Sequence, residues 1–230
     1  MANRQEIETI IYGNWWGRLG YRIKHWFNKN TKAGSKKNIH AHYDIGNAFY
    51  ALWLDPSMTY SSACFDNKDT PLVEAQIAKY QKIIQSLTVT PGEKILEVGC
   101  GWGGLMEQAC LNGINIDCLT ISEEQAKYAR ERGGRIQAKD LGQHQILLQD
   151  YRDHQEQYDG IASIEMFEAV GEEYWPAYFQ SVNRLLKNGG KAAIQTIVIQ
   201  DELFDRYRKG TDFIQQYIFP GGMLPSPAKF

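Results

Sequence analysis

A glycine-rich turn at residues 95–104 is the part of the chain whose residue types and spacing point most directly to chemistry. It reads Ile-Leu-Glu-Val-Gly-Cys-Gly-Trp-Gly-Gly, an apolar strand that breaks into glycines before a helix begins near Leu105. Such a turn lets a ligand approach the backbone closely, because glycine has no side chain to keep it away. A P-loop would place Lys and Ser or Thr after its last glycine, but this chain has Leu105, Met106 and Glu107. A site for a nucleoside triphosphate is therefore not predicted.

The spacing of the glycines narrows the ligand further. Gly99, Gly101, Gly103 and Gly104 form the pattern G-x-G-x-G-G, whereas the dinucleotide fingerprint requires G-x-G-x-x-G. With Glu97 two positions before the first glycine, the segment resembles motif I of the S-adenosylmethionine-dependent methyltransferases. In that class the glycines pass under the methionine part of the cofactor. The alternative is a tight strand-to-helix turn that uses glycine for backbone reasons alone.

Composition and length limit the class of protein. The chain has 230 residues, of which 43% are hydrophobic, and this favours one packed domain with an extension. It has no apolar run of about 18 residues and no apolar N-terminal region typical of signal peptides, so we expect a cytoplasmic protein whose membrane contact is peripheral. No Cys or His pair has metal-ligand spacing, so no metal site is predicted. The cysteines are expected to be reduced thiols: Cys64, Cys100, Cys110 and Cys118.

Residues 1–37 are predicted to be a basic amphipathic arm. Residues 1–40 carry eight Lys and Arg against two Glu, which leaves 17 basic and 25 acidic residues in the body. Within the arm, Ile11, Trp15, Leu19 and Trp26 recur at helical spacing with basic residues between them. This pattern suits a helix at an anionic membrane surface, and it suits equally a helix docked on the body. Because the body is acidic and the basic stretch is short, no nucleic-acid partner is predicted.

The elements that must position the turn follow from residue 91 onward. Apolar strand patterns alternate with helical patterns, which predicts an α/β fold with a mostly parallel sheet, helices on both faces and right-handed crossovers. Ligands in such sheets bind beyond the carboxyl ends of the strands, where the glycine turn lies. The predicted strands are 94–98, 115–120, 145–149, 161–164 and 191–199, and the predicted helices are 103–111, 122–132 and 174–186. The helix from 122 is expected to open with a capping box of Ser122 and Gln125.

Two more strand ends are predicted to bind the cofactor. At the tip of the second strand, hydroxyl and amide groups can take the ribose hydroxyls, although a helix cap is the simpler interpretation for Ser122. The end of the third strand can place a carboxylate near the adenine amino group and an aromatic ring against the base. The residues at these two ends, with one from the fourth strand, are Thr120, Ile121, Ser122, Gln125, Gln149, Asp150, Tyr151 and Ile164.

A narrower resemblance covers roughly residues 38–226. Seven segments occur in the order seen in the cyclopropane-fatty-acyl-phospholipid synthases, namely 42–47, 54–61, 96–104, 119–122, 148–152, 163–171 and 216–222. The resemblance implies a Rossmann-like class I methyltransferase fold and transfer of a methylene group from S-adenosylmethionine to the cis double bond of an unsaturated phospholipid acyl chain. It also favours the membrane interpretation of the basic arm. Tyr60 and Ser61 are implied to contact the carboxylate side of the cofactor.

The family also implies a bound bicarbonate that removes a proton from the transferred methyl. Glu168 matches the glutamate of the family's M-F-E motif, and Glu165 is set aside because it lies three residues outside that register. At the other matched ligand positions, Ser62 stands where the family has a cysteine and Gln195 stands where it has a histidine. Ile197 matches the isoleucine of the family. A glutamine can hydrogen-bond an anion but cannot carry a positive charge or pass on a proton. Bicarbonate is therefore expected only if Gln195 can hold it.

The resemblance divides the chain into three parts. They are the arm at 1–37, a helical segment at 38–90 that covers the cofactor and substrate, and the cofactor-binding core at 91–230. Family members continue beyond the position of Phe230 with further strands, so the core is expected to be incomplete at its C-terminus. Three functions stay open: a cyclopropane synthase, a sister lipid methyltransferase with a methyl-branched or methylene product, and a non-catalytic fragment that binds the cofactor or a membrane. The oligomeric state also stays open, with a homodimer among the alternatives.

Overall fold

The computed structural model describes residues 34, 46–136, 141–210, 214–219 and 221–230. The predicted amphipathic helix of the basic arm lies outside the described residues. The start of the predicted covering segment, residues 38–45, lies outside them too.

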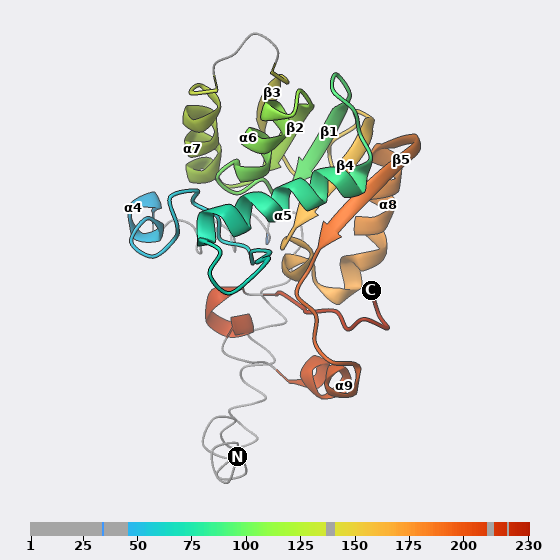
Figure 1. The fold of residues 1–230 in the computed structure, drawn as a ribbon. Helices are drawn as coiled ribbons and strands as arrows, with labels where there is room; N and C mark the ends of the chain where they lie inside the picture. The colour runs from blue at the N-terminus through green and yellow to red at the C-terminus, as the bar shows by residue number, and fades with distance from the viewer. Residues whose placement is uncertain (1–33, 35–45, 137–140, 211–213, 220) are drawn as a thin grey trace.

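A five-stranded parallel sheet forms the centre of the molecule. Its strands follow the order β3-β2-β1-β4-β5, and every neighbouring pair is parallel, as the alternating pattern predicts. In Figure 1 the strands point towards the lower half of the molecule, so their carboxyl ends meet at one edge. The strands are β1 (Lys94–Val98), β2 (Asn115–Thr120), β3 (His144–Leu148), β4 (Tyr158–Ile164) and β5 (Leu186–Gln195).

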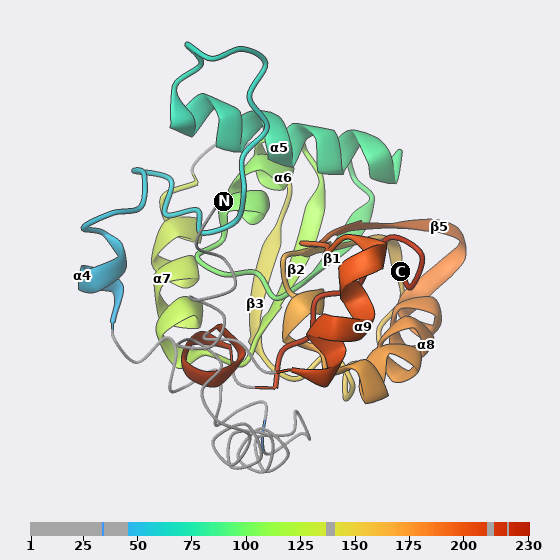
Figure 2. The ribbon, with the colours of Figure 1, turned by 90° about the horizontal axis from the view of Figure 1, so that it is seen from below.

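Helices cover both faces of the sheet, as Figure 2 shows from the carboxyl ends of the strands. One face carries α5 (Leu72–Leu87), α6 (Gly104–Leu111) and α7 (Glu123–Gly133), and the other carries α8 (Trp175–Leu185) and α9 (Asp201–Lys209). Within the described ranges, none of the helices is both long and apolar enough to cross a bilayer. Shorter helical turns are α4 (Asn47–Tyr50), η1 (Phe167–Ala169), η2 (Glu172–Tyr174) and η3 (Ile214–Ile218).

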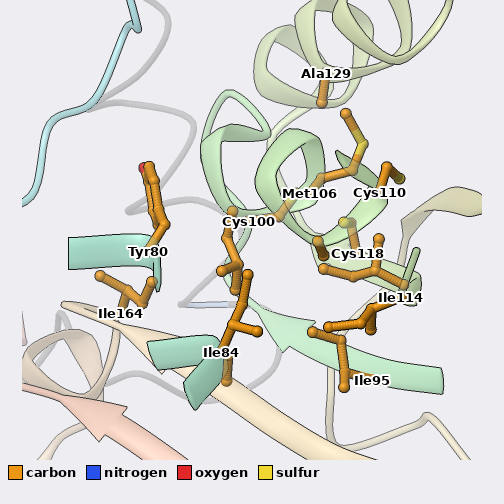
Figure 3. Close-up of a cluster of buried hydrophobic side chains, with 14 of the residues drawn as sticks. Tyr80, Ile84, Ile95, Cys100, Met106, Cys110, Ile114, Cys118, Ala129 and Ile164 are labelled. Carbon is orange, nitrogen blue, oxygen red and sulfur yellow. The ribbon is translucent and has the colours of Figure 1, made fainter. Parts of the chain in front are cut away.

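Two hydrophobic clusters lie on opposite faces of the sheet. Side chains of β1 alternate between them, with Ile95 in the cluster under α5 and α6 and Leu96 in the cluster under α8. Figure 3 shows the first cluster, to which Met106 and Cys110 of α6 and Ile95 of β1 all belong. By this alternation Glu97 also lies on the α5 face, where an apolar residue would be expected. The strand that leads into the glycine turn therefore carries a carboxylate into the interior.

Two predicted boundaries at the end of the sheet are wrong. We expected the turn Asn188-Gly-Gly190 to close a helix and a strand to run from 191 to 199. Instead α8 ends at Leu185, and β5 begins at once because Leu186 pairs with Tyr158. The residues 187–190 form an irregularity in β5, since the next pair joins Lys191 to Gly160. The strand ends at Gln195 because its partner in β4, Ile164, is the last residue of that strand.

Candidate functional site

A cavity of about 640 Å³ lies at the carboxyl edge of the sheet. The ends of β1, β2, β3 and β4 line the cavity, and residues 58–61, 214–215, 218–219 and 222–224 contribute to it as well. Figure 1 shows α9 and the dark red turn η3 beyond this edge of the sheet. Many of the predicted site residues line the cavity: Tyr60, Ser61, Glu97, Gly99, Gly101, Thr120, Ile121, Gln125, Gln149, Asp150, Tyr151, Ile164, Glu168 and Ile197. Ser62, Gly103, Ser122 and Gln195 are not among the lining residues.

The glycines of the turn serve different purposes. Gly99, Gly101 and Gly103 all have positive φ, at 83°, 51° and 80°, a region that L side chains rarely adopt. A Cβ at Gly103 would lie 3.1 Å from Met106 Cε and 3.3 Å from the Cβ of Ala129, so this glycine lets α6 and α7 pack. A Cβ at Gly101 would meet no protein atom within 4 Å, because this glycine faces the cavity. The backbone at Gly101 is therefore open to a ligand.

Glu97 is a buried carboxylate in the wall of the cavity. Glu97 is only 3% exposed, and this burial raises the pKa of its carboxyl from 4.5 to about 8. The charges of Lys79 and Arg132 oppose this shift without cancelling it. Cys118 Sγ donates to Glu97 Oε2 over 3.9 Å. A buried acidic group facing a cavity is suited to bind a cationic ligand, because the cation compensates the charge of a carboxylate that burial has removed from water.

The tip of β2 forms a small polar network beside the turn. Ser122 Oγ accepts a hydrogen bond from the amide of Gln125 at 3.3 Å, which caps α7 as the capping-box pattern predicts. The side chain of Gln125 turns elsewhere, because its Oε1 accepts from Thr120 Oγ1 at 3.0 Å. The amide of Ser122 donates to Thr120 Oγ1 at 3.1 Å. Thr120 and Gln125 line the cavity, whereas the side chain of Ser122 serves as a helix cap.

The end of β3 places an ion pair and an aromatic ring at the cavity. Asp150 Oδ2 lies 2.5 Å from Arg152 Nη2, and both residues line the cavity. Tyr151 also lines it, and burial raises the pKa of this phenol to about 12, so the ring stays neutral. Gln149 Oε1 lies 3.0 Å from His154 Nδ1. This end can therefore offer a flat apolar ring beside hydrogen-bonding groups, which suits a nucleoside base.

Lys79 of α5 is a site residue that sequence reasoning missed. It is 1% exposed, and its Nζ donates to Ser61 Oγ at 2.6 Å and to Gln76 Oε1 at 2.7 Å. Burial lowers the pKa of this ammonium to about 8. Because Ser61 Oγ accepts from Lys79, its own hydroxyl proton can be donated into the cavity. The only sequence signal was position, since Lys79 follows Ala75 and Gln76 on the buried face of α5.

We expect Ser61→Ala to weaken S-adenosylmethionine binding by roughly 10-fold, the usual worth of a hydrogen bond to a charged group. The variant loses the hydroxyl that Lys79 orients toward the cavity. Isothermal titration calorimetry measures the change. Ser86→Ala is the matched control, because Ser86 is an exposed serine whose Oγ donates to Lys82 O of its own helix. Equal affinities for the two variants would contradict a cofactor role for Ser61.

Packing around the turn ties the covering segment to the sheet. Trp102 Nε1 donates to Asn47 Oδ1 at 2.7 Å, and its ring lies 4.9 Å from that of Tyr50, so α4 rests on the turn. Trp102 is 3% exposed and also lines the cavity. A Cβ at Gly104 would lie 2.3 Å from the hydroxyl of Tyr80, which explains why glycine is needed there.

The second polar group at the cavity centres on Glu165. Glu165 Oε1 accepts from the amide of Ser62 at 2.9 Å, from Ser62 Oγ at 2.5 Å and from Gln195 Nε2 at 2.9 Å. Ser62 and Gln195 therefore meet, as the resemblance implied, but they meet on a carboxylate of this chain. The interpretation that set Glu165 aside is thus incomplete. Glu165 lines the cavity together with Glu168.

Glu168 occupies a separate position in the same wall. Its Oε1 accepts from the amide of Ile197, and its Oε2 is buried without a partner in the described part of the chain. Burial raises the pKa of this carboxyl, and the charge of Glu165 adds to the shift. The two glutamates therefore engage different donors, with Ser62 and Gln195 on one and Ile197 on the other.

These residues do not fit a bicarbonate as the family pattern requires. The amides of Ser62 and Ile197 already donate to Glu165 and Glu168, and Gln195 donates to Glu165 as well. A bound anion would have to displace these carboxylates and would lie beside two like charges. The donors in this wall therefore serve carboxylates of the chain itself.

A cluster of possible metal ligands lies elsewhere in the sheet. Among the described residues, Asp117, His154 and Glu156 bring one ligand atom each within 4.8 Å of one another. Lys94 Nζ lies 2.7 Å from both Asp117 Oδ2 and Glu156 Oε1, so its ammonium group forms ion pairs with both carboxylates. Tyr158 also donates to Asp117 Oδ2 at 2.6 Å. The cluster is an ion-pair network that joins β1, β2 and β4.

The fold is that of the class I, S-adenosylmethionine-dependent methyltransferases. Residues 30–230 match the family model for mycolic acid cyclopropane synthetase. The chain therefore belongs to the cyclopropane synthase family. It is 40% identical over 205 residues to the tuberculostearic acid methyltransferase UfaA1 of Mycobacterium tuberculosis, a match that covers 86% of this chain and 47% of the relative.

Two further relatives support this assignment. The cyclopropane-fatty-acyl-phospholipid synthase of Escherichia coli K12 is 41% identical over 191 residues, with 80% of this chain and 46% of the relative covered. The crystal structure of the mycolic acid cyclopropane synthase CmaA1, complexed with SAH and CTAB, superposes with a TM-score of 0.75 at 36% identity. That match covers 84% of this chain and 71% of CmaA1. The chain spans about half the length of the first two relatives.

Proposed function

We propose that the protein transfers the methyl carbon of S-adenosylmethionine to the cis double bond of an unsaturated phospholipid acyl chain. The observation that carries the proposal is one cavity that joins the glycine turn and Glu97 to the carboxylates of Glu165 and Glu168. The glycine turn and Glu97 suit a cationic nucleoside cofactor. The carboxylates of Glu165 and Glu168 suit a reaction in which the product must lose a proton.

The lining of the cavity matches the demands of the reaction. An alkene is a weak nucleophile, so the sulfonium methyl and the double bond must be held in line, and alignment can contribute about 7–11 kcal/mol. Attack by the alkene leaves a carbocation, which the faces of aromatic rings stabilise. The lining of the cavity supplies such rings among apolar groups, and these residues are Tyr174, Tyr207, Ile214, Ile218 and Phe219.

The cofactor would lie across the carboxyl edge of the sheet. Gly99 and Gly101 would pass beneath its methionine part, and Glu97 would face its cationic groups. Ser61, oriented by Lys79, would donate to its carboxylate. Thr120 and Gln125 would take the ribose hydroxyls, while Tyr151 and Asp150 would contact the base. The bound CmaA1 structure, which holds SAH and the long-chain CTAB, supports an arrangement with cofactor and alkyl chain together.

A sister activity is the second candidate. In it the acyl chain would receive a methylene or methyl branch rather than a ring. The identities to UfaA1, a tuberculostearic acid methyltransferase, and to the E. coli cyclopropane synthase are nearly equal, at 40% and 41%. The glutamine at position 195, where the family has histidine, favours the sister activity. The ring and the methylene branch need the same methyl transfer and the same loss of one proton, whereas a saturated methyl branch would also need a hydride from a separate reductant.

We further propose that the protein works at the cytoplasmic surface of a membrane. Large apolar side chains of the covering segment are exposed, with Leu52 at 82%, Trp53 at 50% and Phe49 at 44%. The ring of Trp53 contacts that of Tyr60, which lines the cavity, at 5.4 Å between centroids. An apolar surface that continues into the cavity wall would let an acyl chain leave the bilayer without crossing water.

The test is incubation with methyl-labelled S-adenosylmethionine and vesicles of unsaturated phospholipid. We expect label in the acyl chains, and proton NMR of the released fatty acids distinguishes a ring from a branch. Vesicles of fully saturated phospholipid are the matched control, because they offer the same surface without a double bond. Label in neither lipid, with cofactor binding intact, would refute the proposed activity. Transfer to free unsaturated fatty acids alone would refute the phospholipid as substrate.

A further inference from the structure

Glu165 is held in a conformation that its residue type does not favour. Its φ is 47°, in the left-handed region, where a non-glycine residue costs about 1 kcal/mol or more. The backbone is fixed there because the amide of Glu165 donates to Gln195 O at 2.8 Å. This conformation ends β4 and directs the side chain to Ser62, which precedes it by more than 100 positions in the chain. Strain of this kind is kept where the side chain has a task.

The carboxylate of Glu165 lies among the donors that the family pattern assigns to bicarbonate. Ser62 supplies its amide and its hydroxyl, and Gln195 supplies its side-chain amide. All three donate to Oε1, and none of the hydrogen bonds between described residues reaches Oε2. Bicarbonate and a glutamate side chain both present a carboxylate group, so the same donors can orient either. Only one of them can occupy the position at a time.

We propose that Glu165 is the general base of the reaction and replaces the bicarbonate used by the family. This inference rests on the proposed function. The π electrons of the alkene form a C–C bond with the sulfonium methyl as the C–S bond breaks, and S-adenosylhomocysteine leaves with the sulfur electron pair. A carboxylate oxygen of Glu165 then takes a proton from the transferred carbon. The C–H electron pair closes the ring, or it forms an exocyclic double bond if a hydride has shifted first.

The neighbouring residues suit Glu165 better than Glu168 for this role. Gln195 is a neutral donor, so it can hold the carboxylate in place without competing for the proton. Glu165 is partly exposed, so the proton can pass to water after each turnover. Glu168, in contrast, is committed to the amide of Ile197, and its second oxygen is buried. Glu168 is therefore a positioning residue that holds the strand end after Gln195.

The proposal is tested by chemical rescue. Glu165→Gln keeps the size of the side chain and removes the base, and we expect turnover to fall at least about 100-fold, the usual contribution of a general base. Glu165→Gly suits the positive φ and frees the three donors. We expect added bicarbonate or formate to restore turnover in the glycine variant, saturably, and not in the glutamine variant. Unchanged S-adenosylmethionine affinity in both variants shows that the fold is intact.

The wild-type protein provides the opposite test. We expect its turnover to be the same in buffer freed of carbon dioxide and in buffer with added bicarbonate. Loss of turnover in the depleted buffer, or full turnover by Glu165→Gln, would overturn the proposal. A titration with ¹³C-bicarbonate followed by NMR separates this result from failure of the proposed function. We expect binding to Glu165→Gly only, and binding to the wild type would overturn the proposal even if no lipid is a substrate.

Discussion

Gly101→Ala is expected to lower the affinity for S-adenosylmethionine about 100-fold, which corresponds to about 2.7 kcal/mol of binding free energy. The added methyl would meet no protein atom within 4 Å, so the protein itself has room for it. That room is the cavity, where the cofactor must approach the backbone of the turn. The methyl would therefore take the place of cofactor atoms rather than disturb the core. Equilibrium titration of the purified variant measures the loss.

Gly92→Ala is the matched control for backbone strain. Gly92 has φ 92° and open space around its Cβ position, as Gly101 has, but it lies in the turn before β1 and does not line the cavity. Both variants should lose a similar amount of thermal stability, since both force alanine into a left-handed conformation. Only Gly101→Ala should lose the cofactor. Equal affinities would show that the glycine turn is structural and binds no ligand.

The affinity for S-adenosylmethionine is also expected to rise with pH, by up to about tenfold per unit between pH 6 and 7.5. Burial raises the pKa of Glu97 to about 8, so the free protein holds this carboxyl protonated over that range. The cofactor carries sulfonium and ammonium charges, which favour the ionised form. Binding therefore releases a proton from Glu97, and the free energy that this release costs falls as pH approaches 8. Calorimetry in buffers of different ionisation enthalpy measures the proton directly.

Glu97→Gln is the control for this pH dependence. It is isosteric and cannot titrate, so its affinity should be lower and nearly independent of pH in the same range. The stability of the free protein should show the opposite trend. The raised pKa of Glu97 contributes stability that is fully present below pH 4.5 and is lost as pH rises through about 8. A wild-type affinity that stays constant from pH 6 to 7.5 would contradict the assignment of Glu97 to the cofactor.

The sequence predicted the parts of the site that depend on local pattern. The strands before and after the glycine turn were predicted at Lys94–Val98 and Asn115–Thr120. Each could be recognised because its apolar residues and the glycines that bound it lie close together in the sequence. The cap at Ser122 followed from spacing alone. Lys79 could not be recognised in this way. Its role depends on Ser61, which the chain brings back beside α5 only when the fold is complete.

The two glutamates after β4 show a second limit of sequence reasoning. Glu165 and Glu168 are separated by three residues, which suggests one turn of a helix, and the family register pointed to Glu168 alone. In the structure Glu165 has φ 47° and η1 begins only at Phe167, so the pair is not on one helix. The two carboxylates therefore reach different donors. Backbone conformation at a single residue decided which of them meets Ser62 and Gln195.

The proposed reaction is tested most directly with S-adenosylmethionine that carries a fully deuterated methyl group. After incubation with unsaturated phospholipid vesicles, mass spectrometry of the acyl chains counts the deuterium atoms that reach the product. We expect two of the three, because a base removes one as the ring or the methylene forms. Acyl chains without deuterium would contradict the proposed function. Chains that keep all three would contradict the loss of a proton to Glu165.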